Sequence, residues 1–261
     1  MSRANTIDEV LARLDEHVAR SRRERSRLGY FAALYRGVTA RVREGIVAGR
    51  FEDGGRMERL DVVFANRYLD ALERHRRGKP TSRSWAVAFD AARSPFPIVL
   101  QHLLLGINAH INLDLGVAAA EAAPGDRLAP LRKDFDAVND ILCSMVDGAQ
   151  DRLARVSKWM TVLDRVGCRT DEEVMNFSIG KARACAWAAA ERLNRLEDEG
   201  DRRREIEALD LHAAFRARLV RHPGVTYSAA NLVVRLSERG DAAQIIDALG
   251  RDSAAEAQRQ G

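Results

Sequence analysis

A histidine and an aspartate, His110 and Asp114, lie one helical turn apart beside a stretch of chain without charge. Between Arg93 and Asp114 the sequence reads SPFPIVLQHLLLGINAHINL. In a helix, side chains four residues apart are neighbours on one face. A carboxylate beside an imidazole orients the ring and increases its basicity. We therefore expect His110 and Asp114 to act together, either as metal ligands or as a base with its orienting carboxylate.

His102 and Gly106 lie on the same slanting stripe of the predicted helix. His102 precedes His110 by eight residues, which is about 12 Å along a straight helix. The two histidines can therefore share one metal ion only if the helix is kinked near Gly106. Otherwise His110 and Asp114 take ligands from another helix, or His102 belongs to a separate network. Glycine costs a helix roughly 1 kcal/mol relative to alanine, which predicts that a close neighbour or a substrate uses the space at Gly106.

Amide side chains form a second stripe on another side of the same stretch, with Gln101, Asn108 and Asn112 as its members. Buried polar groups are retained when each finds a hydrogen-bond partner. These amides predict either contacts with backbone groups where helices approach closely, or contacts with a substrate. Asn108 and Asn112 are therefore candidate substrate-binding residues.

Other helices must supply the rest of a site. The segment ERLDVVFANRYLDALERH contains polar side chains that can point inward, and SWAVAFDAA contains a tryptophan. These two segments provide five further candidate substrate-binding residues, namely Asp61, Asn66, Tyr68, Asp70 and Trp85. The carboxylates of DFDAVNDIL are also available, but a solvated acidic face is the favoured interpretation of that segment.

Helical periodicity runs through almost the whole chain, and no alternating run predicts a strand. The 261 residues are 46% hydrophobic and 31% charged, as in a folded globular protein. We predict an all-α fold in which roughly ten helices form one bundle-like domain over residues 1–250. A central buried helix at about 95–120 is expected to lie at its core. Residues 251–261 are expected to be a flexible tail.

Capping and helix-breaking residues predict the boundaries of the elements. Thr6 with Glu9 forms a capping-box pattern at the start of the first helix. Further helices are expected over 28–47 and 56–77, and Ser84 is the predicted cap of a short helix that holds Trp85. The later helices are predicted at 129–156, 159–166, 170–200, 201–222, 228–239 and 242–249.

Composition and motifs limit the compartment and the partners. The N-terminal residues have no apolar run typical of a signal peptide, and the polar side chains at 95–120 argue against a membrane span. Three cysteines without a CxxC pair predict no disulfide framework. The net charge of +4 comes without a recognisable nucleic-acid module. We predict a cytoplasmic protein that takes a small-molecule ligand or substrate, without nucleic acid or membrane, and the oligomeric state stays open.

Four segments together resemble a bacterial family of unknown function. They are RMERLDVVFANRYLDA, SWAVAFDAA, QHLLLGINAHINLDLG and DFDAVNDIL, and the family's signature is a QHLLLG-x-NAHINLDLG block. The resemblance covers most of the chain, and its central block is long and specific. It implies an all-helical domain centred on these residues, without an assigned activity to carry over.

Three functions fit these observations. The favoured one is a metal-dependent, hydrolase-like enzyme in which His110 and Asp114, joined by His102 and a carboxylate such as Asp61 or Asp70, hold zinc or iron beside an activated water. The second is a metal-free isomerase, cyclase or hydrolase in which His110 is the base, Asp114 orients it, and Asn108 or Asn112 holds a developing oxyanion. The third is a helical protein that binds a ligand without chemistry. Sequence motifs of nucleotide-binding folds, serine hydrolases and zincins are not found.

Overall fold

The computed structural model describes residues 3–139, 141–142, 179–224, 234–235, 238 and 241–250. These residues contain no strand, and their helices confirm the predicted all-α domain. In chain order the helices are α1 (Ile7–Arg23), α2 (Gly29–Val47), α3 (Gly54–Arg76), α4 (Arg83–Arg93), α5 (Val99–Ala109), the π-helix η1 (His110–Leu115), α6 (Gly116–Ala122), the 3₁₀ turn η2 (Gly125–Arg127), α10 (Ile179–Arg195), α11 (Glu199–Arg221) and α13 (Ala242–Gly250). Residues 128–139 are helical as well.

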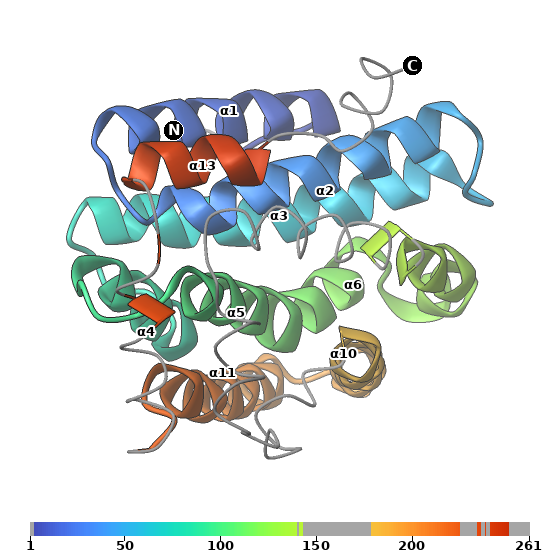
Figure 1. Ribbon diagram of the computed structural model, residues 1–261. Helices are drawn as coiled ribbons and strands as arrows, with labels where there is room; N and C mark the ends of the chain where they lie inside the picture. The colour runs from blue at the N-terminus through green and yellow to red at the C-terminus, as the bar shows by residue number, and fades with distance from the viewer. Residues whose placement is uncertain are drawn as a thin grey trace, which may run out of the picture.

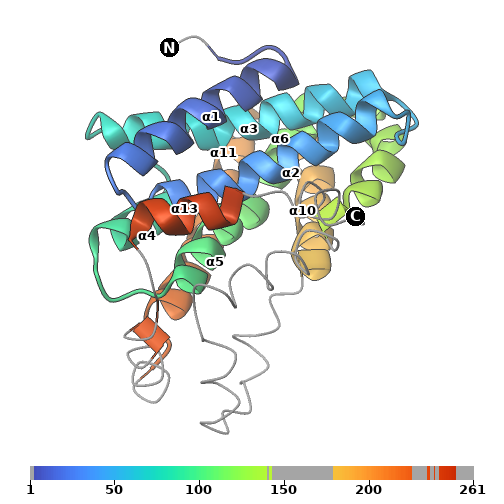
Figure 2. The same cartoon turned by 45° about the horizontal axis from the view of Figure 1, so that its top comes forward.

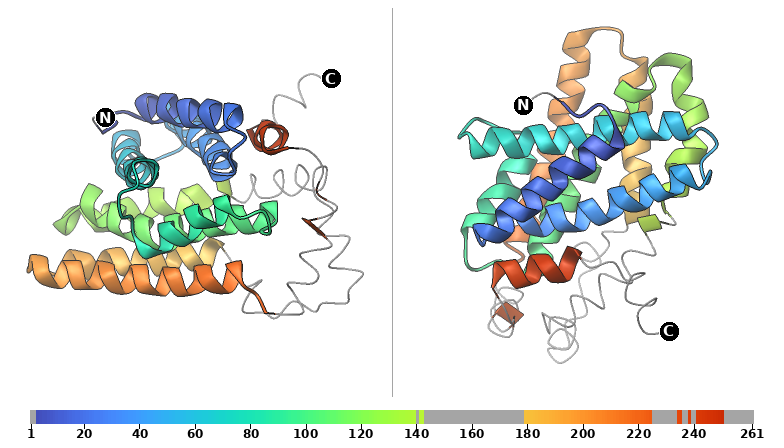
Figure 3. Two further views of the ribbon diagram at one scale, coloured as in Figure 1. Left: turned by 90° about the vertical axis from the view of Figure 1, so that its left-hand side faces the viewer. Right: turned by 90° about the horizontal axis from the view of Figure 1, so that it is seen from above.

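The helices are arranged in three layers (Figures 1 and 3). The first layer contains α1, α2, α3 and α13, the middle layer contains α4, α5 and α6, and the third contains α10 and α11. Figure 2 shows α13 beside α1 and α2, although it comes last among the described helices. An ion pair of 2.7 Å between Arg22 and Asp247 joins α1 to α13. The middle layer is therefore covered on both sides.

The middle layer is built on one continuous helix, Val99–Ala122, which we call the central rod. It consists of α5, η1 and α6, and it corresponds to the helix predicted at about 95–120. By length and composition the central rod could cross a membrane, but 83% of its most apolar stretch is buried inside the protein. Pro95 and Pro97 precede it. Proline has no amide hydrogen to donate within a helix, so the regular helix begins after them.

The π-helix lies in the central rod where the sequence predicts the site. It begins at His110 and contains Asp114. In a π-helix the backbone hydrogen bonds join residues five apart, so the turn is wider than in an α-helix. Such segments are rare and are frequently found at functional sites. At Gly106, by contrast, the rod is regular α-helix. A kink at that glycine, which is one of the three alternatives for the two histidines, therefore does not occur.

Two glycines allow the other layers to approach the central rod closely. A Cβ atom on Gly106 would lie 2.5 Å from the ring of Phe31 in α2. A Cβ atom on Gly116 would lie 2.6 Å from the carbonyl oxygen of Ala186 in α10. The space at Gly106, which the sequence assigns to a neighbour or a substrate, is thus filled by the Phe31 side chain.

The start of α4 differs from the prediction. Ser82, and not Ser84, is its N-cap, and the Ser82 side chain accepts a hydrogen bond from the Trp85 amide. The Ser84 hydroxyl instead donates to Asp210 of α11 at 2.7 Å. Both serines precede the same apolar run, so only the contact with α11 distinguishes their roles.

The helix predicted at 170–200 also ends earlier than expected. The structure ends α10 at Arg195, and α11 begins at Glu199 with Asp198 as its side-chain cap. Some predicted elements fall wholly or mostly outside the described residues, namely the later part of 129–156, the helices at 159–166 and 228–239, the start of 170–200 and the tail 251–261.

Substituting Gly116 by alanine is expected to lower the free energy of unfolding by about 1–3 kcal/mol, because the new methyl group collides with the backbone of α10. Gly55 in α3 is the matched control, since a Cβ atom there would have its nearest neighbour at 3.5 Å. Gly55→Ala is expected to leave stability unchanged or to raise it by up to about 1 kcal/mol. Urea unfolding of both variants measures the difference, and equal stabilities would contradict the close packing at Gly116.

Candidate functional site

The candidate site is centred on the buried carboxylate of Asp114, which three side chains from different helices contact. His110 Nδ1, on the same π-helix, lies 3.4 Å from Asp114 Oδ2. Trp85 Nε1 of α4 donates to the same oxygen at 2.8 Å, and Arg67 Nε of α3 donates to Oδ1 at 3.1 Å. Asp114 is only 2% exposed. Its charge is therefore stabilised by protein groups, as a buried carboxylate requires.

Arg67 connects this network to the surface. Its Nη1 atom lies 3.2 Å from Glu121 on α6, and its side chain is 23% exposed. Arg67 is not predicted from the sequence, because nothing local distinguishes it from the many arginines on solvated faces. Arg67 lies one turn after Phe64 on α3. It reaches Asp114 only because α3 packs against the central rod.

Five aromatic rings contact His110, and we call them the aromatic cage: Phe31, Tyr35, Phe64, Tyr68 and Trp85. Phe64 stacks on the imidazole with a centroid distance of 3.6 Å and an interplanar angle of 8°. Tyr35 meets the imidazole edge-on at 4.5 Å. Phe64 is half-buried, whereas His110 is 3% exposed, so the Phe64 ring separates the imidazole from solvent.

Burial in this cage controls the charge of His110. It lowers the pKa of His110 below the ordinary value of 6.5, although the Asp114 carboxylate partly opposes the shift. The imidazole is therefore neutral at pH 7. A neutral imidazole carries one hydrogen, and the carboxylate at Nδ1 favours the tautomer that places it there. His110 Nε2 then has a free lone pair, and it has no hydrogen-bond partner in the described part of the chain.

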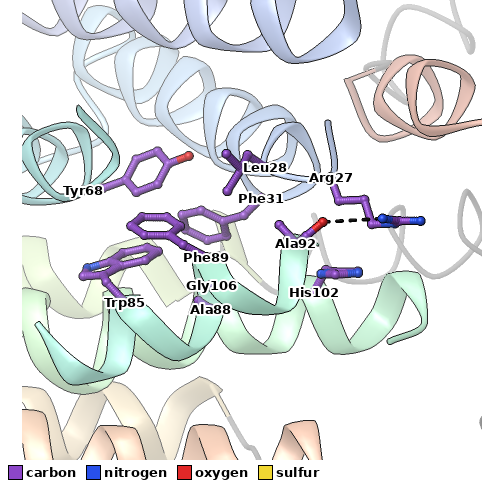
Figure 4. Close-up of a pocket in the computed structure, with 10 residues that line it drawn as sticks. All are labelled: Arg27, Leu28, Phe31, Tyr68, Trp85, Ala88, Phe89, Ala92, His102 and Gly106. Carbon is purple, nitrogen blue, oxygen red and sulfur yellow. Dashed lines mark hydrogen bonds between the residues drawn. The ribbon is translucent and has the colours of Figure 1, made fainter. Parts of the chain in front are cut away.

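His102 lies apart from His110, about 12 Å along the unbroken central rod. It meets Tyr30 edge-on at 5.5 Å. Figure 4 shows that it lines a small cavity between α3, α4, α5 and the start of α2 with the turn before it. Above it, Arg27 donates to the carbonyl oxygen of Ala92 at 3.4 Å. The histidines predicted to share a metal are therefore in different surroundings.

The cavity beside His102 has a volume of about 20 Å³, which is enough for a water molecule but not for a substrate. Three members of the aromatic cage also line this cavity, namely Phe31, Tyr68 and Trp85. One layer of aromatic rings thus lies between the cavity and His110.

The amide stripe of the central rod binds α11. Gln101 Nε2 donates to a carbonyl oxygen of α11 at 2.7 Å, and Asn108 Nδ2 donates to the Ala213 carbonyl at 2.8 Å. Asn112 donates to Asn108 at 3.0 Å and accepts from Arg216 at 3.1 Å. These amides therefore join the middle and third layers, and the structure places Asn108 and Asn112 away from the aromatic cage.

The predicted residues of α3 have separate surroundings. Tyr68 belongs to the aromatic cage. Asn66 forms two hydrogen bonds of 2.9 Å with the backbone of Ala4, and Asp70 forms an ion pair of 2.9 Å with Arg3 at the surface. Asp61 is buried, and burial raises its pKa to about 7. Of the residues predicted from the sequence, the structure brings together His110, Asp114, Tyr68 and Trp85.

A zinc or iron ion at this centre would need further ligands. Among the described residues, no three His, Cys, Asp or Glu side chains form a group that could hold a metal. Asp114 already accepts hydrogen bonds from Trp85 and Arg67, and the adjacent guanidinium opposes a second cation. The described donor set thus gives no support to a site built from His102, His110 and Asp114.

Comparison with known protein families matches residues 7–223 to a family of unknown function, DUF5995. The chain belongs to this family. The DUF5995 match runs from the start of α1 to just beyond α11, so it contains Asp114, its three partners and the whole aromatic cage. No curated protein and no solved structure matches the chain.

Replacing Trp85 by phenylalanine removes a hydrogen bond to a buried charge, and it is expected to lower the free energy of unfolding by about 1.5–3 kcal/mol beyond the packing loss. Trp187→Phe is the matched control, because Trp187 Nε1 donates to Glu191 at 2.8 Å and Glu191 is only half-buried. The Glu191 carboxylate can turn to solvent. Equal losses for the two variants in urea unfolding would contradict a stabilising buried hydrogen bond between Trp85 and Asp114.

Burial, followed by the charges of Arg27 and Arg235, lowers the pKa of His102 to about 3. Below pH 6.5 the unfolded chain therefore protonates this histidine, whereas the folded protein does so only near pH 3. Proton binding then favours the unfolded chain, so the free energy of unfolding is highest above pH 6.5 and decreases as the pH falls. Between pH 8 and pH 5, the native chain should lose about 2 kcal/mol more than His102→Gln. Parallel pH profiles of the two proteins would show that His102 is not held neutral by burial.

Proposed function

We propose that this DUF5995 protein is a small-molecule enzyme that uses metal-free acid–base chemistry, with His110 as the base. One observation carries the proposal: Asp114 faces Nδ1 of a neutral, buried His110, while Nε2 has no partner in the described part of the chain. A neutral imidazole with a free nitrogen and an oriented second nitrogen is suited to accept a proton. The second of the three predicted functions therefore becomes our preferred one.

The residues around the base have distinct roles in this proposal. Asp114 orients the imidazole and stabilises the positive charge that forms when Nε2 takes a proton. Trp85 and Arg67 hold the Asp114 carboxylate in place, because each donates to one of its oxygens. The reaction class is proton abstraction from a substrate, as in an isomerase or cyclase, or from water, as in a hydrolase.

A substrate must reach an imidazole that the aromatic cage encloses. Phe64 is the half-buried ring on its outer face, and it stacks on His110 from α3. Rotation of the Phe64 side chain would uncover the imidazole while leaving the Asp114 network in place. The cage also favours an apolar or aromatic substrate, since aromatic rings bind such surfaces and exclude water. A cytoplasmic location and a small-molecule partner belong to the same proposal.

Incubating the protein with a fractionated metabolite extract, followed by mass spectrometry, tests this function without a known substrate. We expect the native chain to consume a compound at least about 100-fold faster than His110→Asn, since a general base contributes about 10²–10⁴ to the rate. His212→Asn, at an exposed histidine of α11, is the matched control and should retain full activity. Circular dichroism must show that both variants are folded.

The other predicted functions give different results in the same experiment. Activity that chelation removes and added zinc or iron restores would support the metal-dependent alternative. A compound that is retained by the protein but not converted would support a ligand-binding protein. Turnover that His110→Asn leaves unchanged would overturn the role of His110.

A further inference from the structure

Three buried polar groups lie between α2 and α3, apart from the Asp114 network. They are the hydroxyls of Tyr35 and Thr39 and the carboxyl group of Asp61, which are 4%, 0% and 4% exposed. Tyr35 OH, Thr39 Oγ1 and Asp61 Oδ2 all lack a hydrogen-bond partner in the described part of the chain. Leaving one such group unpaired is unfavourable, and three in one place call for an explanation.

The antiparallel packing of α2 and α3 brings these groups together. Tyr35 of α2 contacts Phe64 of α3 with a centroid distance of 6.0 Å. Thr39 lies one turn after Tyr35, and Asp61 lies about one turn before Phe64. In antiparallel helices this spacing is expected to place Thr39 and Asp61 on facing sides. Electrostatics agree with this placement: burial and then the Asp61 carboxylate raise the pKa of Tyr35, and the nearby Thr39 hydroxyl lowers it, although the two hydroxyls form no hydrogen bond of normal geometry.

We propose that Tyr35, Thr39 and Asp61 form an internal water site between α2 and α3. A buried water molecule typically forms about three hydrogen bonds to protein groups that would otherwise be unpaired. Two hydroxyls can donate or accept, and a carboxyl group offers two oxygens, so the three side chains match the needs of water. One bound water satisfies all three groups at once.

The internal water site adjoins the candidate base. The Tyr35 ring that forms part of it is also in the aromatic cage, 4.5 Å from the His110 ring. Water is thus held one aromatic side chain away from the imidazole. The site does not depend on a catalytic role for His110, and its test needs no substrate.

The melting temperature of Thr39→Val distinguishes a shared water from groups that are simply unpaired. Valine has nearly the shape of threonine, so the variant should fold. If water joins the three groups, removing one hydroxyl leaves the others under-satisfied, and the melting temperature falls by about 2–4 °C. If Thr39 has no partner, valine leaves the temperature unchanged or raises it. Thr81→Val is the control, because the half-buried Thr81 hydroxyl donates to the adjacent backbone carbonyl of Ser82.

Oxygen-17 magnetic relaxation dispersion of the full chain counts long-lived internal waters directly. The triple variant Tyr35→Phe, Thr39→Val, Asp61→Leu should lose at least one such water while its melting temperature stays above that of Thr39→Val, since all three polar groups are removed together. An unchanged count of internal waters in the folded triple variant would overturn the proposal. So would a Thr39→Val variant that melts at or above the native temperature.

Discussion

The burial of the Asp114 charge is the constraint on which the rest of the site depends. An ionised carboxylate inside a protein is stable only when charged or strongly polar donors surround it. Here the donors come from two neighbouring helices, Arg67 from α3 and Trp85 from α4. This requirement sets how α3 and α4 lie against the central rod, and the wider turn of the π-helix presents His110 to the same carboxylate.

The polar residues of the central rod divide between its two sides. On the side of the first layer, His110 and Asp114 form the candidate site. On the side of the third layer, Gln101, Asn108 and Asn112 hydrogen-bond to α11. The rod is therefore rich in polar groups, because each amide joins it to α11 through hydrogen bonds. It carries no charge before Asp114, because a buried charge would need its own charged or polar partners. The DUF5995 match includes both sides of the rod.

Parts of the site could be predicted because their signals are local. His110 and Asp114 are separated by one helical turn, so their proximity follows from helix geometry alone. Trp85 could be named as a candidate because a tryptophan seldom occurs without a packing role, but its hydrogen bond to Asp114 joins residues far apart in the sequence. Arg67 and Phe64 could not be found, since their positions against His110 depend on how α3 crosses the rod. Asn66 is predicted to bind a substrate but lies outside the site, because its side chain forms hydrogen bonds with the backbone of Ala4.

The sequence by itself determined the helical class, the central buried helix and the pairing of His110 with Asp114. Those features follow from periodicity and from side-chain spacing, which act over a few residues. Only the tertiary structure decided that His102 lies in separate surroundings, that the amides bind α11, and that five aromatic rings enclose His110. These outcomes depend on which helix faces meet across layers. The faces that meet are set by the packing of side chains far apart in the chain and by the hydrogen-bond donors that can reach the buried carboxylate.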